Sequence, residues 1–133
     1  KTSFIHDDEI VQPGYHRVYL PENNVWVENT TTDRVSYYRF RWTKETEAQL
    51  LLSLYGLLGN SRMTDADVKK INDQEFEGSL SSVDRAYNVG PKDIKIFFVV
   101  QVDRKWKSLD GWNGGERFRD ISALKGDSAG VSS

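Results

Sequence analysis

Arg34-Val-Ser-Tyr-Tyr-Arg-Phe-Arg-Trp42 alternates from one side chain to the next, whereas the following stretch, Thr43-Lys-Glu-Thr-Glu-Ala-Gln-Leu-Leu-Leu-Ser-Leu-Tyr-Gly-Leu-Leu58, repeats its apolar residues at helical spacing. Side chains of a strand point alternately to opposite faces of a sheet, while those of a helix return to one face every three or four residues. The change of period therefore predicts a strand over residues 34–42 and a main helix over residues 44–58.

The flanking segments extend this pattern in both directions. Apolar alternation bounded by turn residues predicts strands over residues 15–20, 25–28, 93–104 and 116–122. A shorter helix is expected over residues 64–73. Residues 76–87 also fit helical spacing, although Gly78 and several serines would allow an edge strand, and we predict a helix there.

The predicted fold class is α+β. We expect a single domain with a mostly antiparallel sheet of about five strands, the main helix 44–58, and one or two shorter helices packed on one face. A length of 133 residues suits one domain with its own core. Residues 1–14 are expected to form an N-terminal arm, residues 15–125 the α+β domain, and residues 126–133, rich in Gly, Ser and Ala, a flexible tail.

Composition excludes several function classes. The net charge of −2 gives no overall field that would attract nucleic acid or an anionic membrane. The chain contains no Cys, which excludes disulfides, thiolate metal sites and a cysteine nucleophile. No apolar run approaches the ~20 residues that cross a bilayer, so we expect no transmembrane segment, although a membrane anchor upstream is compatible with the sequence. Because the chain begins at Lys1, we expect a periplasmic or secreted protein after processing.

Aromatic and arginine side chains form the candidate binding surface. Tyr37, Arg39 and Arg41 share one face of the strand at 34–42, and Arg117 and Arg119 lie on the last predicted strand. Tyr, Trp and Arg are the residue types that dominate protein interfaces. The same mixture also stacks bases and holds phosphates in single-stranded nucleic-acid binders, but equally it occurs in ordinary cross-strand pairs.

The loop at residues 110–115 contributes Trp112, which we expect to be partly exposed because glycine and asparagine flank it. A loop of this kind can present an aromatic ring to a partner or line a carbohydrate site. We therefore add Trp112 to the five residues above as the predicted partner-binding set.

No motif with a trustworthy spacing supports catalysis or metal binding. The run His6-Asp7-Asp8-Glu9 carries metal-ligand atoms, but consecutive side chains diverge, so we expect a solvated acidic arm. The carboxylates Asp103, Asp110, Glu116 and Asp120 could be paired on a final hairpin, yet twenty acidic residues make such pairs inevitable. We predict no catalytic residue, no metal and no cofactor.

The predicted function is a non-enzymatic protein-binding module, such as an accessory, inhibitor or immunity protein, whose partner is another protein. The sequence contains no family signature that we recognise. The alternative is a small-ligand binder or hydrolytic enzyme with a pocket between the main helix and the sheet. Single-stranded nucleic-acid binding is the lesser alternative.

Overall fold

The fold is built from strands. The computed structural model describes residues 3–4, 6–58, 61–84 and 93–133, and this part of the chain contains no α-helix. Its helical content is a single 3-10 turn, η1 (His6–Asp8). The prediction of an α+β fold is therefore wrong. None of the described segments forms a helix that could span a membrane.

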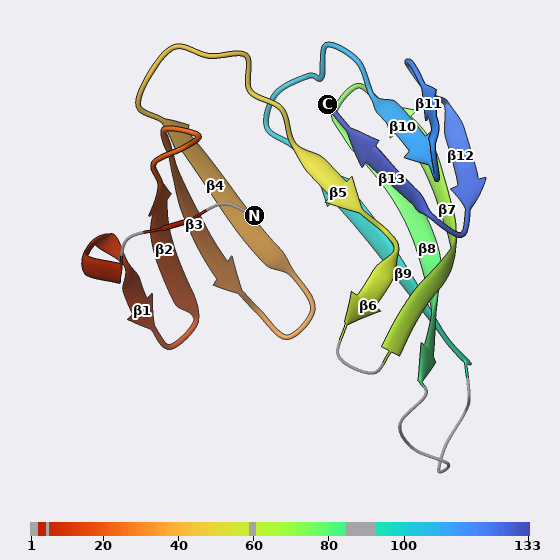
Figure 1. Ribbon diagram of the computed structural model, residues 1–133, viewed down its shortest axis with the longest axis horizontal. Helices are drawn as coiled ribbons and strands as arrows, with labels where there is room; N and C mark the ends of the chain where they lie inside the picture. Colours follow the sequence, from red (N-terminus) through yellow and green to blue (C-terminus); the bar gives the residue numbers. More distant parts are fainter. Residues whose placement is uncertain (1–2, 5, 59–60, 85–92) are drawn as a thin grey trace. The chain divides into compact units, whose positions relative to one another are not determined.

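The chain divides into two compact units, Lys1–Ala48 and Gln49–Ser133, where one domain over residues 15–125 was expected. Unit 1 is an antiparallel sheet in which each strand pairs with the next along the chain (Figure 1). Its strands are β1 (Ile10–Gln12), β2 (Tyr15–Leu20), β3 (Val25–Thr31) and β4 (Ser36–Trp42). Positive φ angles at Gly14 and Asn24 close the first two turns. The strands predicted at 15–20, 25–28 and 34–42 are confirmed.

Unit 2 contains two sheets, which Figure 1 draws in yellow to blue. The four-stranded sheet has the order β11-β10-β13-β5, from β5 (Leu51–Ser53), β10 (Asp110–Asn113), β11 (Glu116–Phe118) and β13 (Ala129–Ser132). The five-stranded sheet has the order β12-β7-β8-β9 with β6 paired to β7, from β6 (Gly56–Leu58), β7 (Ser61–Asn72), β8 (Glu75–Asp84), β9 (Asp93–Gln101) and β12 (Ala123–Gly126).

The core of unit 2 lies between these two sheets. Both sheets contribute to one buried apolar cluster, which consists of Leu54, Ala66, Val68, Phe76, Leu109, Ile121, Leu124, Ala129 and Val131. Burying a large apolar side chain contributes about 1.5–3 kcal/mol. The approach is close, because a Cβ on Gly111 of the four-stranded sheet would lie 2.8 Å from Leu124 of the five-stranded sheet. Unit 2 is therefore a β-sandwich.

The predicted main helix at 44–58 is wrong. Residues 45–50 have no regular structure, and β5 and β6 follow them. Leu54 is 4% exposed while Leu51 is 71% exposed, so the leucines do not share a helical stripe. β5 instead pairs with β13, which lies about eighty residues further along the chain. A partner so distant in sequence leaves no local signal, and Gly56, at φ 120°, adopts a conformation that no helix contains.

The two shorter predicted helices are strands as well. The segment at 64–73 lies largely in β7, where Asp65 has φ 51° and the register with β8 shifts between Thr64 and Asp67. This bulge interrupts the alternation that would have identified a strand. The segment at 76–87 is β8 up to Asp84, and residues 85–87 lie outside the described residues. Phe76 and Leu80 are four residues apart, which suits one face of a strand as well as one face of a helix.

The expected flexible tail at 126–133 is replaced by β13. Ala129 and Val131 are 0% and 1% exposed, and β13 pairs with both β10 and β5. Small residues are required here because Trp112 of β10 lies over Gly130, where a Cβ would overlap the indole ring. The composition that resembled a frayed end therefore reflects close packing.

Candidate functional site

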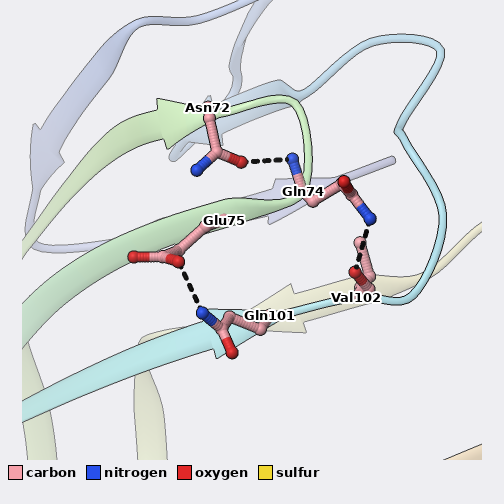
Figure 2. A pocket seen from close by; sticks show the side chains of 5 residues that line it. All are labelled: Asn72, Gln74, Glu75, Gln101 and Val102. Carbon is pink, nitrogen blue, oxygen red and sulfur yellow. Dashed lines mark hydrogen bonds between the residues drawn. The ribbon is translucent and has the colours of Figure 1, made fainter.

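An open pocket of about 320 Å³ lies at one end of the five-stranded sheet, where β7 turns into β8. Its lining consists of Asn72, Gln74, Glu75, Gln101 and Val102 (Figure 2). Four of these five side chains are amides or carboxylates, so the pocket is a polar one.

Strand register brings three of these side chains together. Asn72 of β7 is the partner of Glu75 of β8, and Glu75 is in turn the partner of Gln101 of β9. Directly opposed residues of an antiparallel sheet project from the same face. The three polar groups therefore form the last row of that face, and Gln74 and Val102 follow at the ends of the strands.

Each amide of the pocket is fixed by one hydrogen bond (Figure 2). Asn72 Oδ1 accepts from the backbone N–H of Gln74 at 2.8 Å. Gln74 Nε2 donates to the carbonyl of Val102 at 3.2 Å, and Gln101 Nε2 donates to Glu75 Oε2 at 2.6 Å. These bonds orient the side chains before any ligand arrives.

Backbone hydrogen bonds hold the frame of the pocket. The N–H of Val102 donates to the carbonyl of Gln74 at 2.9 Å, and the N–H of Trp106 donates to the carbonyl of Asp73 at 3.0 Å. Lys70 Nζ lies 3.5 Å from carboxylate oxygens of both Asp73 and Asp120. The β7–β8 turn is thus tied to the segment that follows β9.

Sequence reasoning did not identify any residue of this pocket. The sequence carries a weak signal for the end of a hairpin here. This signal consists of the turn residues Asn72-Asp73 and of Gln101, a polar residue at the end of an apolar run. That signal was lost because β7 and β8 were interpreted as helices, so the three residues of one row were never placed side by side.

Tyr37, Arg39 and Arg41 lie on β4, and a single carboxylate contacts both arginines. Glu28 of β3 lies 3.7 Å from Arg39 and 3.9 Å from Arg41, and its other oxygen accepts the hydroxyl of Tyr15 at 2.8 Å. Tyr37 is 60% exposed. The two arginines therefore take part in cross-strand pairs, one of the alternatives that the sequence left open. Their assignment to a partner surface stays a prediction.

The contact with Glu28 shifts the pKa of Tyr15. Its hydroxyl donates to Glu28, and ionising the phenol would lose that bond and place two negative charges together, so the pKa of Tyr15 is raised above its ordinary value. The titration of Tyr15 therefore reports whether the Glu28 network is intact.

The other predicted residues lie in unit 2. Trp112 of β10 is opposite Arg117 of β11 and opposite Gly130 of β13, and its ring is half-buried over that glycine. Arg119 follows β11 and is exposed. Trp112 is thus part of a strand rather than the tip of a loop, and whether these three residues bind a partner also stays a prediction.

His6 and His16 converge on Glu9. His6 Nδ1 and His16 Nε2 each lie 2.8 Å from a different oxygen of the Glu9 carboxylate. These two contacts hold the pKa of Glu9 below its ordinary value. Across the residues that the structure describes, no group of His, Asp and Glu side chains is arranged to hold a metal ion. The cluster ties η1 and its following residue to β2.

The comparisons with known proteins identify a family. The profile described as "Glycosyl hydrolase family 92 N-terminal domain" matches residues 1–132. No curated protein sequence matches the chain.

Three solved structures illustrate the likeness in fold. The family GH92 α-mannosidase BT3965 from Bacteroides thetaiotaomicron has a TM-score of 0.82 at 18% identity, over 98% of this chain and 18% of its own length. The GH92 family glycosyl hydrolase ccman5 has a TM-score of 0.77 at 20% identity, over 98% and 18%. The GH92 inverting mannosidase BT2199 from B. thetaiotaomicron VPI-5482 has a TM-score of 0.77 at 13% identity, over 98% and 16%. The chain thus spans less than a fifth of each of these structures.

These matches overturn the predicted function. A non-enzymatic accessory, inhibitor or immunity protein is the wrong class, because the family match points to a module of a glycoside hydrolase. The alternative of a pocket between the main helix and the sheet fails as well, because residues 44–58 form no helix.

Proposed function

The chain belongs to the family of glycosyl hydrolase family 92 N-terminal domains, and from this premise we propose that it serves as a β-sandwich module of an enzyme that hydrolyses α-mannosides. The family match over residues 1–132 is the observation that carries the proposal. Two of the similar structures support the choice of sugar, because one is an α-mannosidase and the other an inverting mannosidase.

The module itself contributes framework and binding rather than the hydrolytic pair. Glycosidases of most families flank the scissile bond with two carboxylates, one as acid and one as base or nucleophile. The pocket at the β7–β8 turn carries one carboxylate, Glu75, among amides. The acidic residues considered from the sequence do not line it, and the carboxylate of Asp110 instead accepts the backbone N–H of Asp120 at 3.0 Å. Carboxylates outside the described residues therefore perform the hydrolysis.

An activity assay tests the proposal. The chain is produced alone and, separately, together with all the sequence that its gene encodes on either side. Release of an aryl alcohol from an aryl α-D-mannopyranoside is measured, with the aryl β-D-mannopyranoside and aryl α-D-glucopyranoside as controls.

We expect the complete gene product to cleave the α-mannoside and the chain alone to have no activity. A complete gene product that cleaves none of these glycosides would overturn the proposed function. Cleavage by the chain alone would show that its own carboxylates form the hydrolytic pair and would overturn the division of labour.

A further inference from the structure

The pocket of unit 2 presents an ordered set of free hydrogen-bonding atoms. Each polar side chain uses one atom to anchor itself and leaves another atom without a partner in the described part of the chain. The atoms without a partner are one donor, Asn72 Nδ2, and three acceptors, Gln74 Oε1, Glu75 Oε1 and Gln101 Oε1, and the amide nitrogens of Gln74 and Gln101 each keep a second N–H. Because the anchoring bonds already fix these side chains, a ligand would immobilise little that is not already ordered.

The chemistry of this set selects the class of ligand. Hydroxyl groups both donate and accept, so neighbouring hydroxyls on one ring can pair with the acceptors and with the amide N–H groups of this set at once. A strongly charged ligand is a poorer match, because Glu75 is the one charged residue among five lining residues. Val102 adds an apolar side chain that can lie against ring C–H groups. A volume of about 320 Å³ suits one small ligand.

We infer that this pocket binds a pyranoside through adjacent hydroxyl groups. Glu75 Oε1 accepts one hydroxyl in a charge-assisted hydrogen bond, and Asn72 Nδ2 donates to a hydroxyl oxygen across the same row of the sheet. The amide oxygens of Gln74 and Gln101 accept the remaining hydroxyl protons. The class of ligand follows from the pocket alone, whereas the choice of mannose as the sugar rests on the proposed function.

Two variants each change the chemistry of one free atom while preserving the shape of the pocket. Asn72→Asp keeps the oxygen that accepts from the Gln74 N–H and replaces the free donor with an acceptor. Glu75→Gln keeps an oxygen for Gln101 and removes the charge. The matched control is Glu77→Gln, because Glu77 is two residues further along β8, on the same face and exposed.

Side-chain amide resonances provide the direct readout. The ¹⁵N-labelled chain is titrated with methyl α-D-mannopyranoside, and the amide signals of Asn72, Gln74 and Gln101 are followed by NMR. We expect saturable shifts at these signals, with affinity about fivefold or more weaker in Asn72→Asp and Glu75→Gln and unchanged in Glu77→Gln. The spectrum also reports whether each variant folds, so Glu75→Gln decides the matter should Asn72→Asp unfold.

Three outcomes would overturn the inference: no saturable shift at the three amides, equal affinity in all variants, or shifts produced by calcium chloride and not by the sugar. Failure here is distinguishable from failure of the proposed function. Mannosidase activity of the complete gene product without binding in the pocket would refute the pocket alone. Binding in the pocket without hydrolytic activity would refute the proposed function alone.

Discussion

The two units of the chain are stabilised in different ways. In the described part of unit 2, nine buried apolar residues lie between the two sheets. Among the described residues of unit 1, Val25 is the one buried apolar side chain, and a polar network around Glu28 connects neighbouring strands. A cross-strand pair contributes roughly 0.2–1 kcal/mol, whereas a large core side chain contributes several times more. Burial therefore dominates the stability of unit 2, while unit 1 depends on polar and aromatic contacts between its strands, such as Tyr19 with Trp26.

The largest effect is expected from the core of unit 2. Leu109 is 1% exposed and belongs to the buried cluster. Leu109→Ala should lower the free energy of unfolding by about 2–5 kcal/mol, because it removes buried contacts and leaves a cavity. Urea denaturation measures this loss. The control Leu57→Ala removes a side chain that is 72% exposed and should have little effect, so equal losses in the two variants would refute the assigned core.

A smaller loss is expected where the four-stranded sheet packs against its own tryptophan. Gly130→Ala places a Cβ into the Trp112 ring and should cost about 1–3 kcal/mol of stability through overpacking. Tryptophan fluorescence should change with it. At Gly115 nothing lies within 4 Å of an added Cβ, so Gly115→Ala is the matched control. If Gly130→Ala has the same stability as the wild type, the Trp112 ring does not lie over Gly130.

In unit 1 the expected effect is electrostatic. Because the neutral phenol of Tyr15 donates to Glu28, the stability from this bond is present below about pH 10 and is lost as pH rises through the elevated pKa of the folded protein. Glu28→Gln should lower the pKa of Tyr15 toward its ordinary value, measured by NMR titration of ¹³C-labelled tyrosine. Glu22→Gln, in a neighbouring turn, should leave it unchanged. If the pKa of Tyr15 is the same in the wild type and in Glu28→Gln, the assigned hydrogen bond between Tyr15 and Glu28 is wrong.

The smallest effect is expected at the exposed contacts of Glu9. Because its pKa is depressed by His6 and His16, the stability from its carboxylate is present above the ordinary pKa and disappears as pH falls through the depressed pKa. Glu9→Gln should therefore be less stable than the wild type at neutral pH, and the difference should vanish in acid. Urea denaturation across this pH range measures it, with Asp8→Asn as control. A difference that grows in acid would contradict the assignment.

The same two regions differ in how far the sequence predicts them. Strands β2, β3 and β4 were predicted because each alternates without interruption and pairs with a neighbour across a short turn, as Pro21 to Asn24 illustrate. Strands β5 to β8 of unit 2 were mistaken for helices because their partners are remote or their alternation is interrupted, whereas β9 and β11 lie within the strands predicted at 93–104 and 116–122. Leu51–Ser53 pairs with the far end of the chain, and the bulge at Asp65 shifts the phase of β7.

The candidate pocket was unpredictable for a related reason. Asn72, Glu75 and Gln101 are ordinary surface residues taken one at a time, and they form a set only through the register of three strands. The predicted surface residues Tyr37, Arg39 and Arg41 were found from a single alternating strand. Their common contact Glu28 required the register of β3 against β4, which the alternation alone does not supply.

The pocket rests on a preorganised frame that belongs to the sandwich of unit 2. Native-state hydrogen exchange measured residue by residue tests it most directly. We expect the amides of Val102 and Trp106, which donate to Gln74 and Asp73, to exchange nearly as slowly as those of β7 and far more slowly than those of the three-residue edge strand β1. Exchange at Val102 and Trp106 as fast as in β1 would contradict the claim.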